Sequence, residues 1–570
     1  MGRRWGPAMA ASERAGCVVS ARGAGAEAEG PWSCSGVLLN RRTGLVLCHG
    51  GIVAPFLRAG VGALQPGAGP SFLGADSCRD DLRLHVQWGP GRGPGARAEP
   101  RGALCTPPCS AQPAPRAPAC ARLLLLACCP AFRASFARLF GGDVPEQWRF
   151  AGGGPEPPED EASASGSDDG PLLAALGWFA LLRLEDCTAE EAVGSPRLSV
   201  VPAASLPKGA PLLACGSPFG AFCPDIFLNS LSRGVLSNAA GPLLLTDARC
   251  LPGTEGAGVF SAHGALVALV AAPLCWRARE WVGLSLLCAA DALLRTASLA
   301  LRRLGLQAEA KELAALLPRQ AGDTTTGPQR ALVLQEHGAV WLAAVLVECG
   351  SVWGSGVALA PRLVLTCRHV APREAKRVLV RPATKLLCTL FAPRSPPVWG
   401  EVVFATQDTS PYDVAVVKLE ESLKGIPFPV LASYFHEGED VCVVGFGAFG
   451  QACGPSVTSG ILSAVVEVNE APVMLQTTCA VHGGSSGGPL FTSSGELLGI
   501  VTSNTRDNST GATYPHLNFS IPMAVLQPAL SRYRRTGELL PLRELDRPGE
   551  QVRVVWRLQR VPAQPPRSKL

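Results

Sequence analysis

The feature that most constrains the fold is a dense series of short apolar runs in the second half of the chain. The runs are rich in Val, Ile and Leu, and turn residues such as Gly, Pro, Asn and Asp separate them. Short runs of this kind are typical of strands in an all-β barrel architecture. They lie at residues 339–347, 356–359, 363–366, 378–380, 414–419, 441–444, 460–466, 473–477 and 497–502. One helix is expected to close this domain, near residues 522–534.

The first half of the chain also contains strand-like runs, but insertions and a helical stretch interrupt them. Leucines recur at helical spacing over residues 290–317 and predict helix there. A chain of 570 residues exceeds a single hydrophobic core, so we expect two domains. The predicted organisation is a domain at 1–318 with disordered insertions at about 86–118 and 152–170, a linker at 319–330, a second domain at 331–545, and a C-terminal strand and tail at 546–570.

Composition excludes several classes of function. The net charge of +5 comes without a dense Lys/Arg run, so neither a nucleic-acid groove nor a basic membrane patch is indicated. The apolar runs are too short or too interrupted to span a membrane, and Glu13 and Arg14 interrupt any signal-peptide core. The 21 cysteines lack metal-ligand spacing, so they are interpreted as thiols in a reducing compartment. We expect no metal and no cofactor.

A glycine-rich turn at residues 483–488 contains the candidate nucleophile, Ser486. A serine hydroxyl attacks a carbonyl only when a base removes its proton and donors stabilise the oxyanion. Glycines allow the backbone to bend so that the N–H groups of Gly484 and Ser486 point into one oxyanion hole. A flexible Gly/Ser loop is the alternative interpretation. The hypothesis therefore depends on partners elsewhere in the chain.

Two candidate partners lie earlier in the chain. His369 comes just after the apolar run 363–366, and Asp413 immediately precedes the run 414–419. A base needs a third group that fixes its tautomer, and the order His, Asp, Ser is that of the chymotrypsin-type triad. We expect His369, Asp413 and Ser486 to be the catalytic residues.

Residues 350–535 resemble the trypsin-like serine proteases, and within them the HtrA/Deg branch. Besides the segments around His369 and Ser486, the resemblance rests on residues 354–357, 412–415, 445–447, 458–463 and 519–522. It implies trypsin-like double β-barrel domains and an acyl-enzyme mechanism. His369 would be the general base and then the general acid, Asp413 would orient it, and Ser486 would attack the peptide carbonyl.

The resemblance also indicates which residues line the pocket for the substrate's P1 side chain. Ala480 lies six residues before Ser486, where specificity for basic residues requires an aspartate. Thr502, Ser503 and Asn504 contribute small polar groups. A basic P1 residue would lack its counter-charge in such a pocket. We expect a small or weakly polar P1 residue.

The first half of the chain resembles the second, with its chemistry removed. Residues 245–260 resemble the Ser486 loop and place Glu255 at the serine position. Alignment of residues 45–47 with 363–365 places Gly51 at the histidine position, and alignment of Ala180 with Ala415 places Trp178 at the aspartate position. We therefore expect tandem trypsin-like domains of which the N-terminal one is degenerate and catalytically dead.

The last three residues, Ser568, Lys569 and Leu570, match the pattern of a peroxisomal address, so we expect an import receptor to bind them. Together with the protease-like segments, this ending resembles the peroxisomal processing proteases of the Deg type. The resemblance implies a peroxisomal matrix enzyme that removes leader peptides from imported proteins and makes limited cuts in β-oxidation enzymes, with a preference for Cys at the cut. The alternatives are a general degradative protease and a non-catalytic, chaperone-like pseudoprotease. The sequence leaves a homo-oligomer open.

Overall fold

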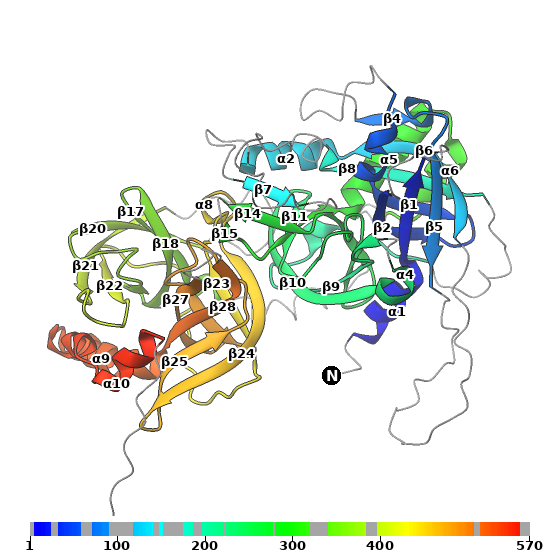
Figure 1. Ribbon diagram of the computed structural model, residues 1–570. Helices are drawn as coiled ribbons and strands as arrows, with labels where there is room; N and C mark the ends of the chain where they lie inside the picture. Colours follow the sequence, from blue (N-terminus) through cyan, green and yellow to red (C-terminus); the bar gives the residue numbers. More distant parts are fainter. Residues whose placement is uncertain are drawn as a thin grey trace, which may run out of the picture. The chain divides into compact units, whose positions relative to one another are not determined.

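The chain forms two compact units in the computed structural model (Figure 1). The N-terminal unit comprises Met1–Leu206, Ala210–Trp276 and Leu284–Asp323, and the C-terminal unit comprises Pro207–Gly209, Arg277–Gly283 and Thr324–Leu570. The structure describes residues 5–23, 32–58, 71–89, 118–140, 148–151, 175–185, 197–220, 223–277, 280–318, 340–383, 396–506 and 513–558.

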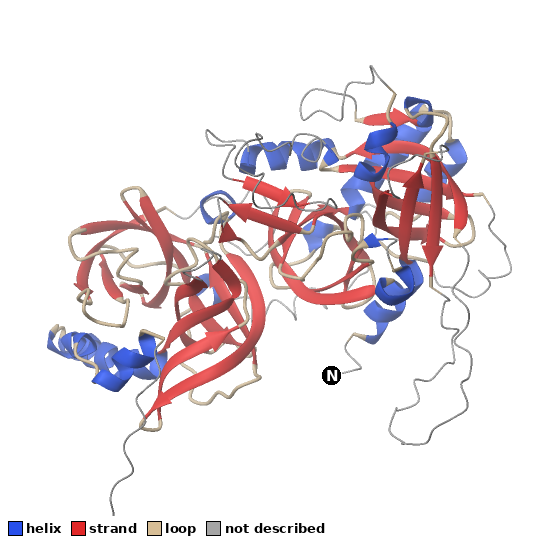
Figure 2. Ribbon diagram, in the orientation of Figure 1, coloured by secondary structure: helices blue, strands red, loops and turns tan. Residues whose placement is uncertain are grey.

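Each unit contains two closed antiparallel barrels of six strands (Figure 2). In the N-terminal unit the first barrel consists of β1 (Gly16–Arg22), β2 (Trp32–Asn40), β3 (Leu45–His49), β5 (Arg83–Trp88), β6 (Ala119–Cys128) and β8 (Trp178–Leu184). The second consists of β9 (Pro211–Gly216), β10 (Ser230–Ala240), β11 (Leu243–Thr246), β12 (Gly258–Ser261), β13 (Leu266–Ala272) and β16 (Ser285–Ala289).

The C-terminal unit repeats this arrangement. Its first barrel consists of β17 (Ala344–Cys349), β18 (Val352–Ala360), β19 (Leu363–Thr366), β20 (Arg377–Pro382), β21 (Val398–Ala405) and β22 (Ala415–Leu419). Its second consists of β23 (Asp440–Gly445), β24 (Ser456–Val468), β25 (Ala471–Thr477), β26 (Pro489–Thr492), β27 (Leu497–Arg506) and β28 (Thr513–Pro522). In all four barrels the strands, taken in chain order, neighbour one another as first, second, third, sixth, fifth and fourth.

The remaining elements are short strands and helices. The strands are β4 (Phe72–Gly74), β7 (Trp148–Ala151), β14 (Leu274–Arg277) and β15 (Glu280–Trp281). The α-helices are α1 (Gly6–Ala15), α2 (Pro130–Phe140), α4 (Pro224–Phe227), α5 (Ala290–Arg303), α6 (Gln307–Ala314), α8 (Gly450–Cys453), α9 (Met523–Thr536) and α10 (Glu550–Trp556). The 3-10 helices are η1 (Gly50–Phe56), η2 (Ala75–Ser77), η5 (Ala203–Ser205), η7 (Val340–Ala343) and η8 (Leu540–Asp546).

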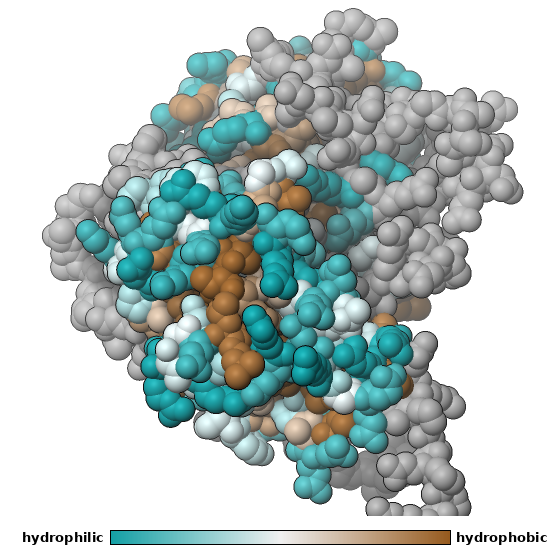
Figure 3. All heavy atoms as spheres, turned by 90° about the vertical axis from the view of Figure 1, so that its left-hand side faces the viewer, coloured by the Kyte–Doolittle hydropathy of each residue, from teal (hydrophilic) through white to brown (hydrophobic). Residues whose placement is uncertain are grey.

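The strands of the C-terminal unit bury side chains on both faces, which explains why they are nearly continuous apolar runs. Val364 and Val417 belong to one buried cluster, whereas the adjacent Leu365 and Val416 belong to another that includes residues of β27 and α9. Successive side chains of a strand point to opposite faces, so each strand serves two cores. On the face seen in Figure 3, most of the described surface is hydrophilic and apolar side chains gather in a narrow band.

The predicted all-β fold with tandem double barrels is confirmed. Helix α9 occurs where one closing helix was expected, whereas the helical stretch predicted at 290–317 is two helices, α5 and α6, which separate at Gly305 (φ +78°). No helix in the described part of the chain combines the length and apolar character needed to cross a bilayer.

The C-terminal strand predicted within 546–570 is wrong, because α10 occupies part of that range. Val552 and Trp556 are spaced one helical turn apart, and both pack against the core of the C-terminal unit. The insertion predicted from residue 86 also begins later, since β5 continues to Trp88. Residues 90–117 of that insertion, the insertion at 152–170 and the linker at 319–330 lie outside the described residues.

Gly256 tests how tightly the N-terminal unit is packed. Its φ is +81°, and a Cβ atom there would lie 2.4 Å from the Ser35 carbonyl oxygen and 2.5 Å from the His49 backbone nitrogen. We expect Gly256→Ala to lower the free energy of unfolding by more than about 3 kcal/mol, because strain and a backbone clash add. Gly305→Ala is the matched control: its φ is +78° and nothing lies within 4 Å, so only about 1–2 kcal/mol of strain is expected. Urea unfolding followed by circular dichroism measures both, and equal losses would contradict this packing.

Candidate active site

His369 and Asp413 are brought together by two neighbouring strands. β19 ends at Thr366 and β22 begins at Ala415, and these two residues are paired in the antiparallel ladder. The segments that follow β19 and precede β22 therefore meet at one end of the barrel. The His369 ring Nδ1 is hydrogen-bonded to Asp413 Oδ2, and the His369 backbone N–H donates to Asp413 Oδ1 at 3.1 Å. A proton on Nδ1 leaves Nε2 with the lone pair that a general base requires.

Asp413 remains ionised although it is largely buried. Burial alone would raise the pKa of its carboxyl, but the hydrogen bonds and charge of His369, together with the charge of Arg368, outweigh burial and lower the pKa below its ordinary value. Arg368 Nε lies 3.9 Å from Asp413 Oδ1. The aspartate can therefore stabilise an imidazolium at His369.

The Ser486 loop is pressed against the strands that lead to His369. Gly487 has φ +82°, and a Cβ atom there would lie 2.1 Å from the Ser355 carbonyl oxygen and 2.5 Å from Thr366 Oγ1. The Ser355 N–H also donates to the Ser486 carbonyl oxygen at 2.8 Å. Only glycine permits this close approach. The contact holds the serine next to the end of β19.

The Ser486 hydroxyl donates to the Thr502 carbonyl oxygen at 3.3 Å. Among the hydrogen bonds of the described residues, none joins this hydroxyl to the His369 ring. Catalytic hydrogen bonds are often long or misaligned without substrate and tighten in the substrate complex. The structure thus brings the three predicted residues to one place and makes the His–Asp contact of the triad.

The predicted oxyanion donors, the N–H groups of Gly484 and Ser486, differ from their neighbours in the loop. In the described structure, neither the Gly484 N–H nor the Ser486 N–H donates to another group, whereas the Ser485 N–H donates to His482 and the Gly487 N–H to Val501. Gly484 has φ +91°. Two donors that wait at a glycine-rich turn suit a developing oxyanion.

Ser355 fixes the orientation of this turn. Its hydroxyl donates to the Gly484 carbonyl oxygen and accepts the Phe446 N–H, both at 2.7 Å. Because the Gly484 carbonyl is held on one side, the adjoining peptide groups cannot rotate freely. A buried hydroxyl with both partners satisfied is a rigid support.

His482 is a residue of this site that the sequence did not single out. Its side chain is buried, and Nδ1 accepts the Ala448 N–H at 3.1 Å. Burial lowers the pKa of His482 to about 4, so the ring is neutral at pH 7. The signal in the sequence was Gly447, because a Cβ atom there would overlap the His482 ring. A glycine at that position does not by itself reveal which side chain fills the space.

The predicted pocket residues lie on two segments beside Ser486. Ala480 is buried just before the loop, and Thr502, Ser503 and Asn504 lie on β27. Thr502 is buried and its hydroxyl donates to the Phe519 carbonyl oxygen at 3.1 Å, whereas Ser503 is exposed. Ala480 carries no charge, so it offers no counter-ion to a basic P1 side chain.

A thiol, an imidazole and a carboxylate meet at this site. The donor atoms of Cys367, His369 and Asp413 lie within 4.8 Å of one another. The Cys367 thiol is fully buried and donates to the Val501 carbonyl oxygen at 3.3 Å. Burial and, second, the charge of Asp413 raise its pKa well above the ordinary value, so it remains a thiol. His369 and Asp413 are engaged with each other.

Comparison with known proteins agrees with this geometry. The trypsin-like peptidase domain family matches residues 354–500. Over its whole length, the chain is 63% identical to the peroxisomal leader peptide-processing protease of Mus musculus and 64% identical to that of Homo sapiens, with 100% of each chain covered. The chain belongs to the family of peroxisomal leader peptide-processing proteases. It is also 31% identical to the serine endoprotease DegS of Escherichia coli (strain K12), over 22% of this chain and 37% of that protein.

In this member of the peroxisomal leader peptide-processing proteases, strand pairing defines the counterparts of His369 and Asp413 in the N-terminal unit. Gly36 pairs with Cys48 as Gly356 pairs with Thr366, and a bulge follows in both cases. Three residues beyond Cys48 lies Gly51, the counterpart of His369. Ala180 on β8 pairs with Cys48 as Ala415 on β22 pairs with Thr366, so Trp178 corresponds to Asp413.

In the N-terminal unit, the loop that corresponds to the Ser486 loop keeps the same supporting contacts. A side chain of the loop, however, binds the N–H group that corresponds to an oxyanion donor. Ser35 donates to the Gly253 carbonyl oxygen and accepts the Ser217 N–H, both at 2.8 Å, as Ser355 does in the C-terminal unit. Gly253 and Gly256 have φ +90° and +81°, close to those of Gly484 and Gly487. The Gly253 N–H, which corresponds to an oxyanion donor, donates to Glu255 Oε2 at 2.8 Å. A carboxylate thus occupies the place of an oxyanion.

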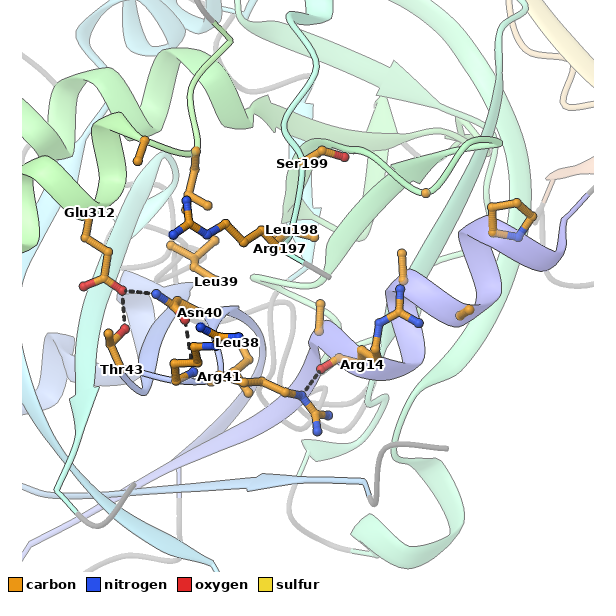
Figure 4. A pocket seen from close by; sticks show the side chains of 18 of the residues that line it. Arg14, Leu38, Leu39, Asn40, Arg41, Thr43, Arg197, Leu198, Ser199 and Glu312 are labelled. Atoms are coloured by element: carbon orange, nitrogen blue, oxygen red, sulfur yellow. Dashed lines mark hydrogen bonds between the residues drawn. The ribbon is translucent and has the colours of Figure 1, made fainter. Parts of the chain in front are cut away.

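The N-terminal unit also contains a cavity of about 490 Å³, which Figure 4 shows from close by. Basic side chains, including Arg14 and Arg197, and the apolar Leu38 and Leu39 line it, and Glu312 Oε1 accepts a hydrogen bond from the Asn40 amide at 2.7 Å. Neither Gly51 nor Trp178 nor Glu255 lines this cavity. It is therefore separate from the counterpart of the protease site.

The buried neutral His482 predicts an acid-sensitive fold. Because its pKa is about 4 in the folded chain and 6.5 in the unfolded chain, the unfolded state binds more protons between these values, and stability falls as the pH falls through this window. We expect His482→Gln to remove up to about 1.4 kcal/mol per pH unit from that dependence. Urea unfolding of the C-terminal unit at pH 6.5, 5.5 and 4.5 measures it. An unchanged slope would show that His482 is not held neutral.

Proposed function

We propose that peptide hydrolysis takes place at His369, Asp413 and Ser486 of the C-terminal unit. His369 Nε2 removes the proton of Ser486 as the hydroxyl oxygen bonds to the peptide carbonyl carbon, and the N–H groups of Gly484 and Ser486 bind the oxyanion. The imidazolium, stabilised by Asp413, then protonates the leaving amine as the C–N bond breaks. Water, deprotonated by His369, releases the acyl group and restores the serine. The His369–Asp413 pair beside the Ser486 loop is the observation that supports this most directly.

The substrates follow from the family and the pocket. The relatives' name specifies leader peptides of peroxisomal proteins, and we assign the same processing role, in the peroxisome, to this chain. Ala480 and Thr502 suit a small or weakly polar P1 side chain. Limited cleavage of β-oxidation enzymes, which the resemblance to Deg-type processing proteases implies, belongs to the same proposal. Ser568, Lys569 and Leu570 lie outside the described residues; we assign them to binding of the import receptor. A homo-oligomer stays a prediction.

The N-terminal unit is assigned no hydrolytic role in this proposal. Gly51 cannot act as a base, Trp178 cannot orient one, and Glu255 occupies an N–H group that an oxyanion would need. The reaction therefore belongs to the C-terminal unit alone.

Removal of the nucleophile tests the proposal. We expect Ser486→Ala to lower kcat on a peptide with alanine at P1 by at least about 10³-fold, because the covalent route is lost. Glu255→Ala is the matched control in the other loop and should leave kcat unchanged. Full-length chains are compared at saturating substrate, with circular dichroism to check folding. Activity that survives in Ser486→Ala would exclude Ser486 as the nucleophile.

A product map separates processing from degradation. A precursor with a leader segment is incubated with the full-length enzyme, and the fragments are identified by mass. We expect one major cut at a small or weakly polar P1 residue, because Ala480 and Thr502 provide no charge for a basic or acidic side chain. Many cuts at unrelated residues would indicate a general degradative protease, and binding without any cut would indicate a pseudoprotease.

A further inference from the structure

Two short segments from the first half of the sequence belong to the C-terminal unit. They are Pro207–Gly209 and Arg277–Gly283. The residues on both sides of each segment belong to the N-terminal unit. Each segment therefore interrupts the N-terminal unit in sequence and contributes to the unit that contains Ser486.

The first segment fastens the stretch that supports His482. Lys208 is buried (4% exposed), and its Nζ donates to the carbonyl oxygens of Cys453 and Pro455, both at 2.8 Å. These carbonyls lie at the end of the short helix α8. The beginning of the same stretch donates the Ala448 N–H to His482 Nδ1. Lys208 thus fixes one end of a segment whose other end holds His482.

Internal hydrogen bonds make residues 447–454 rigid, so that fixing one end by Lys208 also restrains the other end at His482. The Gly450 N–H donates to the Gly447 carbonyl oxygen at 2.7 Å, and the Gly454 N–H donates to the Gly450 carbonyl oxygen at 2.9 Å. His482 is followed directly by Gly483 and Gly484, which lead into the oxyanion hole. Displacement of the segment would therefore move the residue from which the oxyanion loop begins.

The second segment, Arg277–Gly283, packs near residues 478–481, which precede the Ser486 loop in the chain. Glu280 on β15 pairs with Thr513 on β28, and the Trp281 ring lies edge-on to the His516 ring, with centroids 5.5 Å apart. The His516 ring Nδ1 contacts the Thr478 carbonyl oxygen at 3.1 Å, and the Pro515 carbonyl oxygen accepts the Val481 N–H at 3.0 Å. Trp281 thus packs against β28, which is hydrogen-bonded to residues 478–481.

Gly283 brings this segment next to Ala480, a residue of the predicted P1 pocket. Its φ is +72°, and a Cβ atom there would lie 3.2 Å from Ala480 Cβ and 2.9 Å from Pro515 Cγ. Glu280 Oε2 likewise lies 3.5 Å from the position of a Cβ atom on Gly483. The segment therefore packs behind both Ala480 of the predicted P1 pocket and the start of the oxyanion loop.

We propose that Lys208 and Trp281 are positioning residues for the Ser486 site. They touch neither the substrate nor the reacting atoms; they hold the residues on which Gly484 and Ala480 depend. A loop with four glycines among residues 483–488 has much conformational freedom to lose, so its active form needs external support. The inference rests on the proposed function of Ser486. It also gives the first half of the chain a part in catalysis although its own counterpart site is filled.

Lys208→Met in the full-length chain tests the first support. We expect kcat per active site to fall about 10- to 100-fold, with KM changed less than about threefold, because a misplaced oxyanion donor weakens transition-state binding more than substrate binding. Active sites are counted by the end point of labelling with a peptidyl phosphonate, which excludes misfolded molecules. Lys418→Met, at an exposed lysine of β22, is the control and should retain the parent values.

Trp281→Ala tests the second support. We expect the ratio of kcat/KM for a substrate with P1 alanine to that with P1 leucine to fall about 10-fold, because the wall behind Ala480 loosens. Trp399→Ala is the control, since Trp399 is 44% exposed and its ring lies under the Arg377 guanidinium, 4.5 Å from Cζ to the ring centroid.

The outcomes separate this inference from the proposed function. If Ser486→Ala retains activity, the proposed function fails. If Ser486→Ala is inactive while Lys208→Met keeps its kcat per labelled site and Trp281→Ala keeps its selectivity, only the positioning role fails.

Discussion

The close contact between Gly487 and Ser355 is the constraint on which the active site depends. The two barrels of the C-terminal unit supply different members of the proposed catalytic triad, so the proposed chemistry requires that the loop from the second barrel reach the strand ends of the first. A side chain at residue 487 would lie 2.1 Å from the Ser355 carbonyl oxygen, and the loop could not come so near. Ser355 then holds the Gly484 carbonyl, and the oxyanion hole takes its form.

The N-terminal unit has the same architecture without the residues to which we assign the chemistry. Its loop has the same left-handed glycines, and Ser35 makes the same bridge, because these contacts pack two barrels against each other. The catalytic side chains have no such structural duty. Glycine, tryptophan and glutamate replace them, and the glutamate stabilises the N–H that an oxyanion would have occupied. Fold and reaction are thus separable in this chain.

Local patterns were sufficient to predict much of this arrangement. His369 and Asp413 follow and precede apolar runs that proved to be β19 and β22, and strand pairing places Gly51 and Trp178 at the positions indicated by alignment. Contacts distant in sequence left no local signal. His482 resembled any turn histidine, and nothing near Lys208 indicated that its ammonium group meets carbonyls about 245 residues away. The prediction of a strand after residue 546 was wrong because the spacing of Val552 and Trp556 also fits a helix, and the packing of their side chains favours the helix.

We propose that the chain has one nucleophile, Ser486, on a scaffold built twice. Treatment of the full-length protein with an excess of a peptidyl phosphonate, followed by intact mass and peptide mapping, measures this directly. We expect one adduct per chain, located on the peptide that contains Ser486. No adduct, a second adduct in the N-terminal unit, or an adduct at another residue would contradict it.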